Sequence, residues 1–161
     1  MFFSREENSA NRPLLVFVMI ALLVGGTATF FTEPSIPTWY AALAKPSFNP
    51  PNWIFAPVWT TLYVLMGVAA ARVWKQMGFG PEIKVWGAQL VLNFLWSLIF
   101  FWRHMIQVAL IDMAGLWLLI LVTLLLFWRR DRIAGLLMVP YLAWVSFAFA
   151  LNWAIWQLNG A

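Results

Sequence analysis

Indoles, amides and phenols recur at helical spacing in three places along this sequence. They form three stripes: Trp59 and Tyr63; Gln89, Asn93 and Trp96; and Tyr141, Trp144, Ala148 and Asn152. Residues three and four positions apart share one face of a helix, so each stripe combines aromatic surface with a few hydrogen-bonding groups. Aromatic walls with few polar anchors are the usual form of a small-molecule site, and indole faces suit flat, polycyclic ligands. The alternative is that the amides only join helices, each contributing about 0.6 kcal/mol.

Other residue types exclude several kinds of chemistry. The chain has no cysteine and six acidic residues, and His104 is its one histidine. Disulfides, thiol nucleophiles and thiolate metal sites are therefore excluded, and no metal site or required cofactor is predicted. No general acid–base pair is visible, so we do not expect hydrolysis.

The composition indicates a membrane protein. Of 161 residues, 63% are hydrophobic and 10% are charged, whereas a soluble domain is about 45–50% apolar and about 25% charged. A spanning helix needs about 20 mostly apolar residues. Five such runs occur, at 13–31, 54–76, 85–101, 107–128 and 133–158. Because backbone polar groups in lipid must be paired internally, the runs predict one all-α domain, a bundle of five transmembrane helices.

The connection at 32–53, which we call loop 1, is much longer than the other three. It holds the prolines Pro34, Pro37, Pro46, Pro50 and Pro51. Proline fixes φ and lowers the entropy cost of ordering a loop. We therefore expect loop 1 to be a structured lid on the bundle, with a short helix at 39–43.

Lysine and arginine predict the orientation in the membrane. The side of the N-terminus holds eight bases: Arg5, Arg12, Arg72, Lys75, Lys84, Arg129, Arg130 and Arg132. The opposite side holds Lys45 and Arg103. The pattern predicts an inner N-terminus, with loop 1 and the C-terminus outside, in a bacterial cytoplasmic membrane or alternatively an outer membrane. The bases lie at span ends and form no patch for nucleic acid.

The 12 tryptophans divide into two groups. Eight lie near the predicted interfaces, where tryptophan is enriched: Trp39, Trp53, Trp74, Trp86, Trp102, Trp128, Trp153 and Trp156. We expect most of them to form an aromatic belt, whereas a lid would turn Trp39 and Trp53 inward. The other four lie within spans, and of these Trp117 is expected to face lipid or to pack between helices.

Small residues and one acid within the spans have structural interpretations. Gly67-x-x-x-Ala71 and the stripe at 146, 150 and 154 permit close helix contact, either within the chain or in a dimer. Asp112, near the end of its span, is interpreted as a snorkelling or capping residue.

Four segments together resemble the TspO/MBR family of tryptophan-rich sensory proteins and translocator proteins. The segments are Trp39-Tyr40-x-x-Leu43-x-Lys45-Pro46-Ser47-Phe48-x-Pro50-Pro51-x-Trp53, Pro57-Val58-Trp59-Thr60-x-Leu62-Tyr63-x-x-Met66-Gly67, Gln89-Leu90-x-Leu92-Asn93-x-x-Trp96 and Pro140-Tyr141-Leu142-Ala143-Trp144-x-x-Phe147-Ala148-x-x-Leu151-Asn152. The resemblance implies a five-helix bundle, often a homodimer, that binds tetrapyrroles such as protoporphyrin and haem. It implies these ligand residues: Tyr40, Trp53, Phe55, Trp59, Asn93, Trp96, Trp144, Ala148 and Leu151.

Three functions remain open from the sequence. The first is a membrane receptor or sensor for tetrapyrroles, which would also move them or regulate their level. The second, implied by the resemblance, is an enzyme that degrades porphyrin with light and oxygen, using Trp59 and Trp144. The third is a structural or partner-binding protein. Sterol binding is not expected, because Trp153 and Gln157 replace the tyrosine and arginine of the cholesterol motif in animal members.

Overall fold

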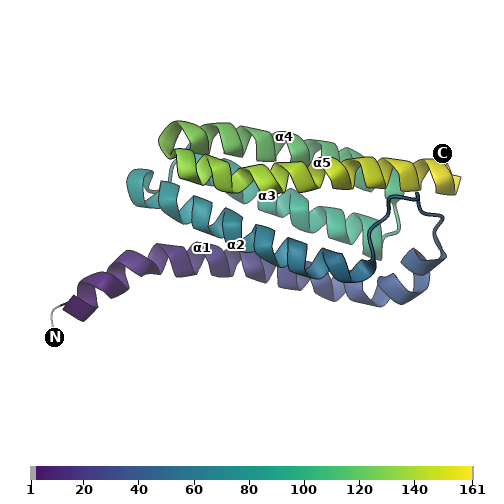
Figure 1. Ribbon diagram of the computed structural model, residues 1–161, viewed down its shortest axis with the longest axis horizontal. Coiled ribbons are helices and arrows are strands. Elements are labelled where there is room, and N and C mark those ends of the chain that lie inside the picture. The colour runs from purple at the N-terminus through teal and green to yellow at the C-terminus, as the bar shows by residue number, and fades with distance from the viewer. Residues whose placement is uncertain (1–2, 161) are drawn as a thin grey trace.

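Five long helices form the molecule, shown as a computed structural model in Figure 1. They are α1 (Phe3–Thr32), α2 (Asn52–Met77), α3 (Pro81–Ser97), α4 (Ile106–Arg130) and α5 (Arg132–Gly160). The structure describes the backbone of residues 3–160 and the side chains of residues 11–160. Each helix contains a segment long and apolar enough to cross a membrane. The predicted all-α, five-helix fold class is therefore confirmed.

The helices extend beyond the predicted spans at several ends. α1 begins ten residues earlier than the predicted span, at Phe3, and Pro13 lies inside it. Proline removes only one backbone hydrogen bond, so the helix continues on both sides of Pro13, while the apolar stretch starts at Asn11. α3 continues into a wider helical turn, η3 (Leu98–Trp102), before the short connection to α4.

Loop 1 is helical in its first half. The short turns η1 (Glu33–Ser35) and η2 (Ile36–Tyr40) prolong α1, and the irregular part covers only 43–51. That part passes beside the C-terminal end of α5 (Figure 1). There Asn159 pairs with the backbone of Ala44: the Ala44 N–H donates to Oδ1 at 2.9 Å, and Nδ2 donates to the Ala44 carbonyl at 2.8 Å.

Close packing of α1 on α2 explains one of the small-residue stripes. A Cβ atom at Gly67 would lie 2.6 Å from the Cα of Val18, so only glycine permits this approach of the two backbones. Ala71, one turn later, is also buried. The stripe therefore packs within the chain.

Trp86 does not belong to an aromatic belt, so that interpretation is wrong for this residue. Its side chain is buried against the ring of Phe17, and its Nε1 donates to the carbonyl of Met66 at 3.1 Å. The first two turns of α3 pack inside the bundle, and the indole contacts both α1 and α2.

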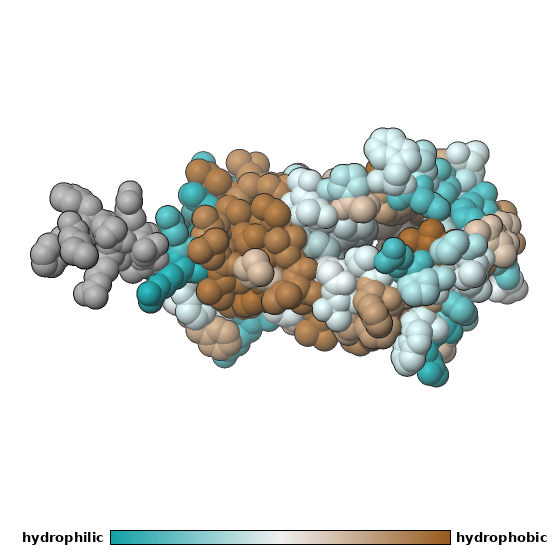
Figure 2. Space-filling model, turned by 90° about the horizontal axis from the view of Figure 1, so that it is seen from below, coloured by the Kyte–Doolittle hydropathy of each residue, from teal (hydrophilic) through white to brown (hydrophobic). Residues whose placement is uncertain are grey.

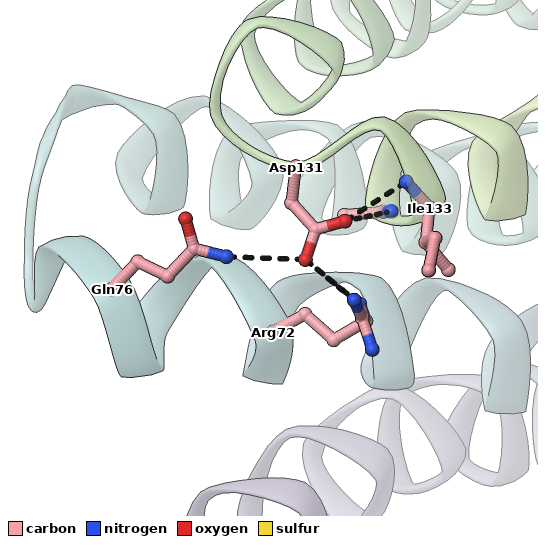
Figure 3. Close-up of polar contacts among 5 residues, drawn as sticks. Arg72, Gln76, Asp131 and Ile133 are labelled. Atoms are coloured by element: carbon pink, nitrogen blue, oxygen red, sulfur yellow. Dashed lines mark hydrogen bonds and ion pairs between the residues drawn. The ribbon is translucent and has the colours of Figure 1, made fainter.

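Asp131 lies between α4 and α5 at the end of the bundle opposite loop 1 (Figure 1), and its carboxylate bonds to α2 and to the start of α5 (Figure 3). Its Oδ1 accepts the backbone N–H groups of Ile133 and Ala134 and so caps the start of α5. Its Oδ2 accepts bonds from Arg72 at 2.9 Å and Gln76 at 3.1 Å, both on α2. Burial acts to raise the pKa of Asp131, but the bonds from Ala134 and Arg72 outweigh it and hold the pKa below its ordinary value.

Candidate functional site

A cavity of about 360 Å³ lies inside the half of the bundle next to loop 1. Its walls come from α1, η2, α2, α3, η3 and α5. Eight of the nine predicted ligand residues line it: Tyr40, Phe55, Trp59, Asn93, Trp96, Trp144, Ala148 and Leu151. The three stripes of the sequence therefore converge on one space of the size typical of small-molecule sites.

Trp53 is the predicted ligand residue that lies outside the cavity. Its side chain is 73% exposed, and it is absent from the lining. α2 begins at Asn52, and from there the face that lines the cavity follows helical spacing through Phe55, Ala56, Trp59 and Tyr63. Trp53 lies three residues before Ala56, on the exposed edge of this face, and its side chain is turned away from the lining. Its assignment as a ligand residue therefore has no support from its location.

Small residues of α1 form a wall that the sequence interpretation missed. Gly25, Ala28, Thr29 and Thr32 all line the cavity. Their spacing of three, four and seven residues marks one helical face, and this was the signal available in the sequence. Gly25 is required by close packing, because a Cβ there would lie 2.3 Å from Cε2 of Tyr63.

The floor of the cavity is a chain of buried hydrogen bonds. Tyr63 donates to Oδ1 of Asn93 at 2.5 Å, and Nδ2 of Asn93 donates to Tyr141 at 3.0 Å. Tyr141 in turn donates to Oε1 of Gln89 at 2.8 Å. The chain connects α2, α3 and α5, and satisfied buried networks of this kind hold their members in one arrangement.

Two of the three indoles that line the cavity are held differently. Trp96 donates to Oδ1 of Asn152 at 3.1 Å and stacks on Phe100 with ring centroids 5.0 Å apart. The ring centroid of Trp144 lies 6.0 Å from that of Phe55 and 5.4 Å from that of Phe147. The buried Nε1 of Trp144 has no hydrogen-bond partner. Buried indole N–H groups usually have an acceptor. The Nε1 of Trp144 is therefore a buried donor without an acceptor, while other atoms of this side chain line the cavity.

The cavity is apolar, uncharged and open on one side. Of the residues that the structure describes, none that lines it carries a charge. Four residues that line the cavity are also exposed on the outer surface: Gly26 and Thr29 of α1, and Ala56 and Thr60 of α2. The opening therefore lies between α1 and α2. Figure 2 views the molecule from the side of α1 and shows a hollow toward the end where the C-terminus lies.

Three side chains that the sequence analysis considered, those of Trp117, Trp39 and Asp112, lie away from the cavity. Trp117 donates to Oγ of Ser146 at 2.8 Å and packs α4 on α5. Trp39 packs beside η3 and stacks on His104, with ring centroids 4.2 Å apart. Asp112 on α4 has one buried carboxylate oxygen without a partner. None of these lines the cavity.

Comparison with known proteins identifies relatives along nearly the whole chain. The sequence profile of the TspO/MBR family matches residues 17–157. The chain is 42% identical to the tryptophan-rich protein TspO of Chlorobaculum tepidum over 92% of this chain and 99% of that protein. It is 39% identical to protein CrtK of Rhodobacter capsulatus, covering 89% and 91% of the two chains. It is 36% identical to the translocator protein of Bos taurus, covering 91% and 90%.

Proposed function

The chain belongs to the TspO/MBR family, and we propose that it is a membrane receptor or sensor that binds tetrapyrroles such as protoporphyrin and haem in this cavity. The observation that carries the proposal is the convergence of Trp59, Trp96 and Trp144 on one uncharged space. Indole and phenol faces gain from stacking on a flat aromatic ring, and this gain needs no matched charge.

The distribution of polar groups supports a ligand that is apolar over most of its surface. Asn93 lines the cavity, and its amide is held by hydrogen bonds with Tyr63 and Tyr141. A fixed polar group among apolar walls orients a ligand, while the walls supply most of the binding free energy. Because the cavity is open between α1 and α2, a ligand need not fit wholly within the enclosed volume.

Quenching of tryptophan fluorescence by protoporphyrin tests the proposal. We expect saturable quenching of the wild-type protein in nanodiscs and clearly weaker binding after Trp144→Ala, because that change removes one aromatic wall. Trp153→Ala is the matched control, since Trp153 lies on the same helix, is 44% exposed and does not line the cavity. Equal affinities for the two variants would contradict the site assignment.

We also propose that loop 1 faces the outside of the membrane, which follows from the distribution of Lys and Arg. The chain contains no cysteine, so single cysteines report their own position. In right-side-out vesicles, an impermeant maleimide should label Ser47→Cys, an exposed position of loop 1, but not Lys75→Cys at the other end of the bundle. The reverse labelling pattern would overturn the orientation.

Light-driven porphyrin breakdown is the second candidate function. The Trp59 ring lies 5.7 Å from Tyr63 and 6.2 Å from Tyr141, so an oxidised indole has two phenols close by. This candidate requires porphyrin absorbance to decay under light and oxygen with a defined product, and Trp59→Phe to stop the decay. A decay equal to that of free porphyrin would exclude it.

A further inference from the structure

The uncharged cavity creates a requirement for any ligand that carries carboxylates. Protoporphyrin and haem each have two propionate groups at one edge of an otherwise apolar ring. No charged residue lines the cavity among those that the structure describes. Burying a carboxylate without a partner is costly. If the proposed function holds, the acidic edge must therefore lie against a cation outside the lining.

Lys45 of loop 1 is a cation placed next to the cavity wall. Its Nζ lies 4.8 Å from the ring centroid of Tyr40, and Tyr40 lines the cavity. Nζ donates to the carbonyls of Leu43 at 3.0 Å and Ala41 at 3.3 Å. An ammonium group has three donors, so one remains for a further acceptor. Within residues 11–160 Lys45 forms no ion pair.

The backbone around Lys45 is fixed before any ligand binds. Ala44, its neighbour, makes the two hydrogen bonds with Asn159 of α5 described above. On the other side, Asn49 accepts a bond from the hydroxyl of Tyr40 at 2.9 Å, which ties the irregular segment to η2. A group that is already positioned loses little entropy on binding, so its interaction contributes more to affinity.

The other base at this end of the bundle is placed differently. The guanidinium of Arg103 lies over the ring of Trp102, 5.7 Å from its centroid, and Trp102 does not line the cavity. Arg103 thus has the same charge sign at the same end of the molecule without a link to the cavity wall.

We propose that Lys45 determines specificity for carboxylate-bearing planar ligands by holding the acidic edge of the ligand at the loop 1 border of the cavity. Its charge then selects acidic tetrapyrroles over neutral ones of the same shape. Lys45 is a binding residue in this account, and Asn159 positions it through Ala44.

The test compares protoporphyrin with its dimethyl ester, which has the same ring and no negative charge. Affinities are measured by fluorescence quenching in nanodiscs of zwitterionic lipid, for wild type, Lys45→Gln, Lys45→Arg and Arg103→Gln. We expect Lys45→Gln to weaken binding of the diacid about fivefold, the effect of a partly exposed ion pair, and to leave binding of the ester unchanged. Lys45→Arg and Arg103→Gln should keep the wild-type ratio of the two affinities.

Two results would overturn the proposal. An unchanged ratio of the two affinities in Lys45→Gln would mean that the charge plays no part in recognition. An equal fall of both affinities would mean that Lys45 only supports the fold of loop 1. Failure of the proposed function is a different result, because the wild-type protein would then show no saturable quenching with either ligand.

Discussion

Gly25 and Gly26 are neighbours on α1, and replacing each by alanine should have opposite effects. At Gly25 an added Cβ would lie 2.3 Å from Cε2, 2.6 Å from Cδ2 and 2.9 Å from Cζ of Tyr63. At Gly26 it would meet no atom within 4 Å. The pair therefore separates the contact between α1 and Tyr63 from any general effect of alanine in this helix.

The size of the effect follows from the surroundings of Tyr63. Ordinary contact begins at 3.4 Å, so the ring has to shift by about 1 Å, and this shift disturbs the 2.5 Å hydrogen bond of Tyr63 with Asn93. Overpacking costs about 1–3 kcal/mol, and losing a buried hydrogen bond costs about 1–3 kcal/mol. We expect Gly25→Ala to lower the free energy of unfolding by about 2–6 kcal/mol in total. Gly26→Ala should be neutral or stabilising by up to about 1 kcal/mol, because alanine favours helix over glycine.

Thermal unfolding in detergent and protoporphyrin titration measure both consequences. A loss of that size should lower the Tm of Gly25→Ala by about 4–24 °C. Its affinity for protoporphyrin should fall as well, because the displaced ring belongs to the cavity wall. Tyr63→Phe is a useful companion, since it removes the hydrogen bond without the clash and should be intermediate. Equal Tm values for Gly25→Ala and Gly26→Ala would show that the contact between Gly25 and Tyr63 does not limit the packing of α1.

Three further predictions concern other contacts. Gly67→Ala should destabilise the bundle by about 1–3 kcal/mol, because its Cβ would meet the backbone of α1 at Val18. Gly87→Ala is the control and should not destabilise it, since a Cβ there would have no atom within 4 Å. Equal chemical denaturation curves for the two variants would contradict this prediction. Asp131→Asn should cost about 1 kcal/mol at neutral pH, discounted because its partner Arg72 is partly exposed. Since the folded pKa of Asp131 is lowered, this advantage of the wild type is full above the ordinary pKa of about 3.9 and is lost as the pH falls through the folded pKa. A pH-independent difference in Tm would show that the charge contributes nothing. Asn159→Ala should speed hydrogen exchange at the Ala44 amide, whose acceptor is Asn159, and unchanged protection there would mean that loop 1 is held by other contacts.

The sequence predicted the parts of the cavity that carry recognisable chemistry. The stripes on α2, α3 and α5 repeat at three and four residues, and this spacing is sufficient to place Trp59, Asn93 and Trp144 on inward faces. Their partners follow the same logic, since Trp96 bonds to Asn152 and Asn93 bonds to Tyr141.

The remaining parts depend on information that local patterns do not contain. The α1 wall consists of glycine, alanine and threonine, which carry no distinctive chemistry, so its role appears only when Tyr63 packs on Gly25. The position of Trp53 depends on where α2 begins, because a shift of one residue turns a side chain by about 100° around the helix. The path of loop 1 depends on Asn159, which lies 115 residues from Ala44.

A structure determined with bound protoporphyrin would show whether the cavity is the tetrapyrrole site. We predict that the tetrapyrrole ring lies under loop 1, in contact with Trp96 and Trp144, with its propionate edge toward Lys45. A ring bound on the lipid-facing surface of the bundle, with the cavity unchanged, would contradict it.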